Sequence, residues 1–163
     1  MPLRESLGRW QAAQGLPLRW SHPEGLHLTL AFLGARPLAA LPLLGSLGAA
    51  VAGRHPAFPL STTRLGGFPE GRPARVLWLG LAPAPALTAL ASDLRAHLAR
   101  ADETFDAKAF RPHVTLARLP APRSPDGFPS PEPTSWIAGE LVLFESRPQG
   151  RYPPLRSWPL GQV

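Results

Sequence analysis

The chain has 163 residues and a mass of 17.5 kDa, the size of one domain. Hydrophobic residues make up 44% of it, which allows a buried core and excludes wholesale disorder, and the lack of cysteine excludes disulfides, thiolate metal sites and a cysteine nucleophile. The net charge is +6 and every basic residue except Lys108 is an arginine, which suits a polyanionic partner, although a GC-rich coding sequence explains the arginine excess equally well.

The first half of the chain predicts helices and strands in alternation. Apolar spacing predicts a helix over residues 3–13, followed by a short extended piece over 18–20. Residues 26–33 (LHLTLAFL) alternate between apolar and other side chains in the first five positions and are apolar afterwards, which predicts a strand. Residues 38–51 predict an amphipathic helix, and residues 57–65 predict an extended segment. The core face of that helix is expected to comprise Leu38, Leu41, Leu44, Leu47 and Val51.

The second half of the chain also predicts alternating strands and helices. Residues 75–81 (RVLWLGL) predict a strand, residues 85–100 a helix and residues 112–119 another strand. Proline, serine and glycine over residues 120–133 predict a long loop. The remaining apolar runs predict two closing strands, over residues 136–144 and 152–160.

No segment predicts a signal peptide or a membrane span. The chain turns polar directly after its first residues, and the longest apolar stretch, residues 38–53, is too short and too interrupted to cross a bilayer. We therefore expect a cytoplasmic protein.

An internal repeat relates two parts of the chain. Residues 75–119 run strand, helix, strand, and residues 1–34 run helix, strand, so the first strand of the first repeat is missing. Two such units related by a pseudo-twofold predict an α+β fold with a groove between them. The sequence thus predicts a single bilobal domain over residues 1–163, in which two units of antiparallel sheet and helix enclose the active groove.

Two short motifs stand at corresponding places in this repeat. Two of the five histidines begin the pattern His, apolar, Thr, Leu: residues 27–30 read HLTL and residues 113–116 read HVTL. Side chains alternate across a strand, so His27 and Thr29 share one face, and His113 and Thr115 share another. If the repeats meet at a pseudo-twofold, both His–Thr pairs line one groove.

Two histidines and two threonines in one groove suit displacement at phosphorus. One neutral imidazole takes a proton from an attacking water, while the other, as imidazolium, protonates the departing oxygen. Threonine hydroxyls donate to the non-bridging phosphate oxygens. Two histidines without a set of nearby carboxylates make a poor zinc site, so we expect no metal and no cofactor. The alternative is that these are strand histidines bonded to the backbone, with threonines chosen for β propensity.

The two motifs resemble those of the two-histidine (HxTx) phosphoesterase superfamily. The longer strings HLTLAFLG (27–34) and RPHVTLARL (111–119) are similar to those of RNA 2′,3′-cyclic phosphodiesterases, historically called 2′-5′ RNA ligases. The resemblance extends to RVLWLGL (75–81) and to the tail from Trp136 to Leu155, and so covers nearly the whole chain.

This resemblance implies a hydrolase that opens a 2′,3′-cyclic phosphate at an RNA 3′ end and leaves a 2′-phosphate. It implies that His27 protonates the leaving 3′ oxygen and that His113 accepts a proton from water. It further implies that Thr29 and Thr115 bind the phosphate, and that Arg118 contacts the phosphate or the nucleotide. Family members also join tRNA halves through a 2′-5′ bond, which is the reverse chemistry.

The family usually begins with a hydrophobic strand before its first helix, and Met1 falls where that strand would already be ending. The resemblance and the repeat therefore both indicate a missing first strand. Either the start of this chain was assigned too late, or the protein tolerates an incomplete sheet with unpaired N–H and C=O groups beside the gap. We expect this to affect stability and activity more than the identity of the site.

Three alternatives stay open from the sequence. The protein is a monomeric phosphodiesterase that acts on RNA ends, a non-catalytic module that binds RNA ends, or a related enzyme that acts on small cyclic nucleotides. Aromatic side chains also have two possible roles, because they either pack in the core or stack on a nucleobase. They are Trp20, Phe32 and Trp78.

Overall fold

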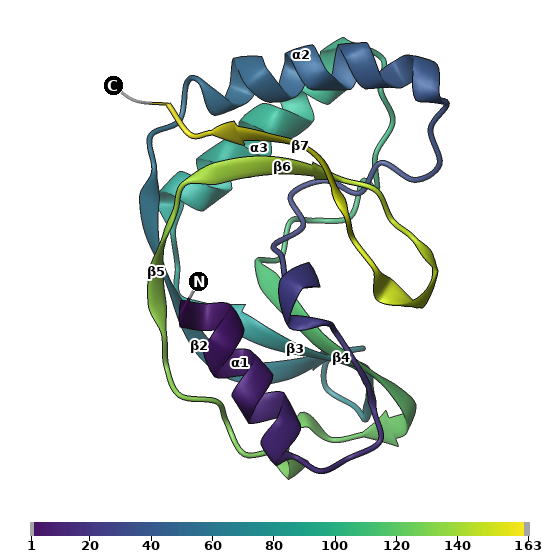
Figure 1. The fold of residues 1–163 in the computed structure, drawn as a ribbon, viewed down its shortest axis with the longest axis vertical. Coiled ribbons are helices and arrows are strands. Elements are labelled where there is room, and N and C mark those ends of the chain that lie inside the picture. Colours follow the sequence, from purple (N-terminus) through teal and green to yellow (C-terminus); the bar gives the residue numbers. More distant parts are fainter. Residues whose placement is uncertain (1, 162–163) are drawn as a thin grey trace.

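The computed structural model describes residues 2–161, so residue 1 and residues 162–163 of the predicted domain lie outside it. Helices and antiparallel sheets are combined in one chain (Figure 1), which confirms the predicted α+β class. The helices are α1 (Pro2–Ala13), α2 (Leu41–Ala52) and α3 (Pro85–Arg100). The strands are β1 (Arg19–Trp20), β2 (Phe58–Phe68), β3 (Ala74–Leu81), β4 (His113–Arg123), β5 (Ser135–Ala138), β6 (Glu140–Phe144) and β7 (Pro154–Pro159).

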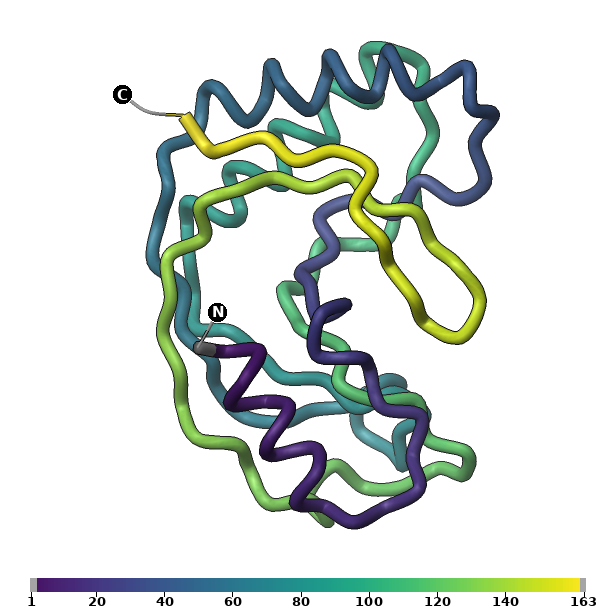
Figure 2. Tube along the Cα trace, in the orientation of Figure 1, coloured from purple at the N-terminus to yellow at the C-terminus, as the bar shows by residue number. Residues whose placement is uncertain are grey.

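Two sheets divide the strands between them. The larger sheet has the order β1-β4-β3-β2-β5, and its neighbours are all antiparallel. The smaller sheet is the ribbon of β6 and β7. Figure 2 shows the chain passing directly from β5 at the edge of one sheet into β6 of the other. The predicted single strand over residues 136–144 is therefore wrong, because it breaks at Gly139 into strands of two sheets.

Two hydrophobic clusters hold the helices onto these sheets. In the first, Leu3 and Leu7 of α1 pack with Leu77, Leu79 and Leu116 from β3 and β4. The second joins α2 and α3 to β2 and to the ribbon of β6 and β7. The buried residues of the second cluster are Val51, Ala52, Phe58, Leu60, Leu87, Leu90, Leu141 and Leu160. The pseudo-twofold between two lobes stays a prediction.

The predicted strand over residues 26–33 is wrong. Only Leu28 pairs there, through an isolated antiparallel bridge to Val114 of β4. The nearby carbonyl oxygen of Leu30 accepts a hydrogen bond from a side chain and not from a neighbouring strand, because Arg95 Nε donates to it at 2.9 Å. The alternating pattern was present, but a strand also needs a partner strand along its length.

The observed bounds agree more closely with the predicted helices than with the predicted loop. Helix α3 has the predicted bounds, and α2 begins at Leu41 after a 3₁₀ turn over Leu38–Ala40. Leu38 does not join the core face, since it is 84% exposed in that turn. The predicted loop over residues 120–133 is shorter than expected, because β4 continues to Arg123. None of the helices in residues 2–161 is long and apolar enough to cross a membrane.

Candidate active site

The bridge between Leu28 and Val114 brings the two His–Thr motifs together. Antiparallel pairing at this point sets His27 opposite Thr115 and Thr29 opposite His113. The two histidines are then diagonal neighbours, and such neighbours lie roughly 7–8 Å apart. One bridge thus gathers four side chains whose motifs are separated by more than eighty residues of sequence.

The core lies on the other side of this group. Val114 is only 2% exposed and packs in the first hydrophobic cluster, and Leu28 packs against that cluster as well. His113 and Thr115 are half-buried on the opposite face of β4. The predicted alternation of core and site residues therefore holds in both motifs.

Both imidazoles are oriented by the same local hydrogen bond. The Nδ1 atom of His27 lies 2.7 Å from the carbonyl oxygen of Gly25, and Nδ1 of His113 lies 2.6 Å from that of Arg111. A carbonyl oxygen only accepts, so each Nδ1 donates. Within residues 2–161, neither Nε2 atom forms a hydrogen bond with the protein. Nε2 is therefore the nitrogen of each ring that can exchange a proton with a ligand.

Aromatic rings from distant parts of the chain pack against each histidine. The centroid of the His27 ring lies 4.5 Å from that of Tyr152 and 5.3 Å from that of Phe144. The His113 ring lies 5.0 Å from Phe68 and 6.2 Å from Trp78. Trp78 was among the aromatic candidates of the sequence, but Phe68, Phe144 and Tyr152 were missed, because nothing in the sequence indicates which aromatics approach the motifs.

Burial lowers the pKa of His27 below its usual value of 6.5. The hydrogen bond to the Gly25 carbonyl opposes this effect, and the nearby positive charges of His113 and Arg4 add to it. Neutral imidazole is consequently the main form of His27 near pH 7 in the free protein. A bound anion would favour the charged form again.

A β-bulge in β4 turns Arg118 toward the same face. Trp78 pairs with Thr115 and Leu77 with Ala117, so β4 has one more residue than β3 over this step. Leu116 and Ala117 are both buried as a result, and Arg118 is exposed. Strict alternation from His113 would have turned Arg118 into the core.

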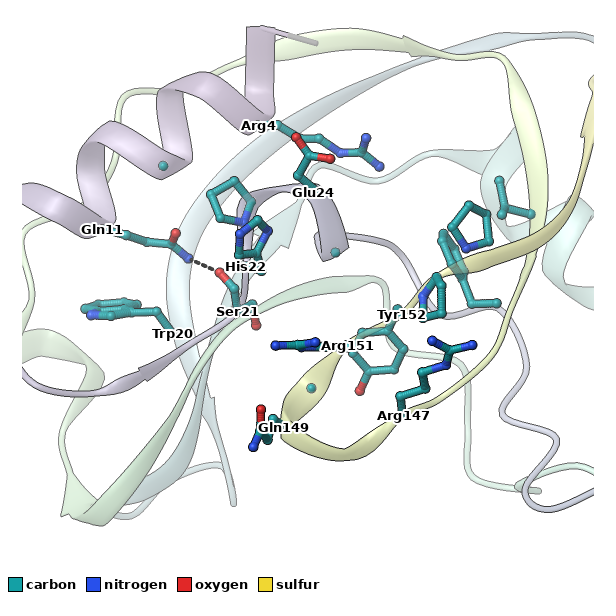
Figure 3. Close-up of a pocket in the computed structure, with 18 of the residues that line it drawn as sticks. Arg4, Gln11, Trp20, Ser21, His22, Glu24, Arg147, Gln149, Arg151 and Tyr152 are labelled. Atoms are coloured by element: carbon teal, nitrogen blue, oxygen red, sulfur yellow. Dashed lines mark hydrogen bonds between the residues drawn. The ribbon is translucent and has the colours of Figure 1, made fainter.

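A cleft of about 1120 Å³, with part of its lining drawn in Figure 3, includes neither His27 nor His113 among its lining residues. Its walls are α1, residues 20–25, β6 and the turn that leads into β7. Tyr152 and Phe144 line this cleft and also pack against His27, so they lie between the cleft and that histidine. The charged side chains of the lining are three arginines, Arg4, Arg147 and Arg151, and two glutamates, Glu24 and Glu140.

Comparison with a family model tests the resemblance of the sequence to known proteins. The family model described as "2′-5′ RNA ligase superfamily" matches residues 2–145. The chain belongs to the 2′-5′ RNA ligase superfamily. This confirms the resemblance of the two histidine motifs and supports a phosphoesterase.

Individual members of the superfamily are similar over most of this chain. An RNA 2′,3′-cyclic phosphodiesterase of Escherichia coli K12 is 33% identical over 98% of this chain and 91% of its own length. One from Geobacillus stearothermophilus is 32% identical over 91% of this chain, which spans about half (50%) of that relative. The crystal structure of E. coli LigT in complex with 3′-AMP superposes with a TM-score of 0.79, at 33% identity, and covers 99% of this chain and 92% of that one.

A separate cluster of titratable groups joins Arg54 and His55, just after α2, to Asp93 and His97 of α3. Asp93 accepts from His55 Nε2 at 2.9 Å and from Arg54 at 3.0 Å, and His97 lies 3.2 Å from its other oxygen. Burial alone would raise the pKa of Asp93, but the hydrogen bonds from His55 and Arg54 lower it on balance. Within residues 2–161, no three histidine or acidic side chains are arranged to hold a metal ion. In this superfamily member, His55 and His97 thus belong to the cluster around Asp93, and His22 lines the cleft.

Proposed function

We propose that this chain hydrolyses 2′,3′-cyclic phosphates at RNA 3′ ends to 2′-phosphomonoesters by histidine acid–base catalysis. The observation that carries the proposal is the pairing of Leu28 with Val114, since it puts two imidazoles and two hydroxyls around one space. The relatives named RNA 2′,3′-cyclic phosphodiesterase support the same reaction. The proposal includes action as a monomer in the cytoplasm, on ends such as those of tRNA halves.

The reaction is a displacement at phosphorus by water. His113 Nε2 takes a proton from the water as its oxygen bonds to phosphorus opposite the 3′ oxygen. As the bond from phosphorus to the 3′ oxygen breaks, His27 Nε2 donates its proton to that oxygen. The product has a 2′-phosphate and a 3′-hydroxyl, and exchange with solvent restores the starting protonation of both rings.

Three other side chains would hold the phosphate during this step. The hydroxyls of Thr29 and Thr115 lie next to the histidines and can donate to its non-bridging oxygens. Arg118, on the same face, neutralises its charge. The negative phosphate also favours the imidazolium form of His27, which offsets the lowering of its pKa by burial. No step in this scheme needs a metal or a cofactor.

The same scheme extends to ligation when the nucleophile changes. If a 5′-hydroxyl of a second RNA takes the place of water at His113, the same proton transfers lead to a 2′-5′ phosphodiester. We include this reverse 2′-5′ RNA ligase activity in the proposal on the strength of the superfamily.

The deciding experiment is a product analysis by phosphorus NMR. The chain is incubated, with a chelator present, with an RNA that ends in a 2′,3′-cyclic phosphate. We expect a 2′-phosphomonoester, with loss of activity in His27→Ala and His113→Ala and retention in the matched histidine control His97→Ala. Unchanged cyclic phosphate bound to the protein would identify a binding module, a 3′-phosphate would refute the proton assignment, and turnover of cyclic mononucleotides alone would identify an enzyme of small cyclic nucleotides.

A further inference from the structure

A flat patch of the larger sheet continues from the histidines across β4, β3 and β2. Residues that pair directly across a sheet share a face. Thr115 pairs with Trp78, and Trp78 pairs with Gly66. His27 lies opposite Thr115 on the other side, so one row reads His27, Thr115, Trp78 and Gly66.

Glycines make room for the tryptophan to lie flat in this row. A Cβ at Gly66 would overlap the six-membered ring of Trp78, and one at Gly80 would lie 3.3 Å from the same ring. The indole Nε1 is buried and has no hydrogen-bond partner within residues 2–161. Packing of the indole face on the glycines, rather than a polar bond, therefore holds Trp78 in place.

Phe68 completes an aromatic surface next to the site. Its ring centroid lies 5.5 Å from that of Trp78, and its ring meets His113 edge-on at 5.0 Å. Phe68 pairs with Val76, and Val76 pairs with Arg118, so Arg118 lies on the same face. Both aromatic side chains remain partly exposed. We call Phe68 and Trp78, with Gly66 and Gly80 beneath the indole, the aromatic floor.

We propose that the aromatic floor stacks the base of the nucleotide whose phosphate reacts, an inference that rests on the proposed function. The row arranges the parts of a nucleotide in order: the 3′ oxygen at His27, the phosphate and 2′ oxygen beside Thr115, and the base over Trp78. A nucleotide carries a flat base and an anionic phosphate on one ribose, and this surface offers flat rings beside an arginine. Stacking tolerates any base, so we expect weak preference among the four.

The test compares two substrates that differ only in whether they carry a nucleoside. Adenosine 2′,3′-cyclic phosphate and glycerol 1,2-cyclic phosphate have the same five-membered cyclic phosphate. We expect Phe68→Ala to raise KM for the adenosine substrate about tenfold, the loss of one stacking contact, and to change KM for the glycerol substrate less than twofold. Phe68→Trp should restore the wild-type value for the adenosine substrate.

Controls separate stacking from packing. Ile137→Ala, on the exposed side of β5, should leave both substrates unchanged. A KM that rises equally for both substrates in Phe68→Ala, or a wild-type KM that is the same for both, would overturn the proposal, because the floor would then only pack against His113.

Binding by calorimetry makes the outcome independent of turnover. Phe68→Ala should weaken the binding of 2′-AMP about tenfold and leave that of inorganic phosphate unchanged. If the wild-type protein opened neither cyclic phosphate but showed this difference in binding, the proposed function would fail and the floor would stand. Equal weakening of both ligands would refute the floor and leave the proposed function intact.

Discussion

The two histidines share a motif and a backbone hydrogen bond, but their surroundings differ. His113 begins the long strand β4, which pairs with β3 on one side and with β1 on the other. His27 lies in a segment with a single bridge, and its ring is enclosed by Phe144 and Tyr152 from the other end of the chain. The backbone of His113 is thus held by a sheet, to which its aromatic neighbours Phe68 and Trp78 also belong, whereas His27 has packing partners from the far end of the chain. Chemistry at His27 should therefore be more sensitive to distant substitutions.

The largest expected effect is the loss of either imidazole. His27→Ala or His113→Ala should lower kcat on a 2′,3′-cyclic nucleotide by roughly 10²–10⁴-fold, the usual contribution of an acid or a base. The double variant should lose less than the product of the two single losses, because the two groups act in one step. A single variant that kept near wild-type kcat in steady-state assays would remove that histidine from the mechanism.

Removal of Arg118 should have the next largest effect. A charge-assisted hydrogen bond to phosphate contributes about 1.5–3 kcal/mol, so Arg118→Ala should lower kcat/KM roughly 10- to 150-fold. Arg118→Lys should recover part of this, because it keeps the charge but not the planar fork. The exposed Arg100 at the end of α3 provides a matched control, and an equal loss in Arg100→Ala would show that net charge alone is responsible.

The bulge before Arg118 also shows which features the sequence does not predict, because strict alternation would have turned this side chain into the core. The helix over residues 85–100 was predicted with its observed bounds, because periodicity is a local property. The strand over residues 26–33 was not, since a strand depends on partners elsewhere in the chain. The repeated motif was enough to predict His27 and His113 as site residues. The packing of Tyr152 against His27 could not be predicted, because it depends on where the ribbon of β6 and β7 lies in the folded chain. The internal repeat stays a prediction.

Substitution of Tyr152 tests the dependence of His27 on distant packing. Tyr152→Ala should lower kcat about tenfold, because the imidazole loses the ring that packs 4.5 Å away. Burial is the main cause of the lowered pKa of His27, so the variant should also move this pKa back toward 6.5, as followed by NMR titration of the ring. Tyr152→Phe keeps the ring and should retain both the wild-type kcat and the wild-type titration. If Tyr152→Ala slowed the reaction without moving the titration, its role would be structural only.

Residual activity in the single-histidine variants assigns the proton roles. In His113→Ala only His27 remains, and as the acid it must be protonated, so kcat/KM should fall as pH rises through the lowered pKa of His27, below 6.5. In His27→Ala the remaining base must be neutral, so kcat/KM should instead rise with pH. The pH profiles of the two variants thus have opposite slopes. Reversed slopes would exchange the acid and the base while leaving the reaction itself unchanged.

The smallest expected effect is on stability. Because the pKa of His27 is lower in the folded chain than its value of 6.5 when exposed, the unfolded chain binds more protons between these two values. The free energy of unfolding should therefore fall as pH drops from 6.5 through that window, and level off once folded His27 is also protonated. Urea denaturation across this range should show a weaker fall in Tyr152→Ala, whose His27 is less buried. An equal fall in both proteins would mean that other groups carry the pH dependence, and that the ring of Tyr152 does not control the protonation of His27.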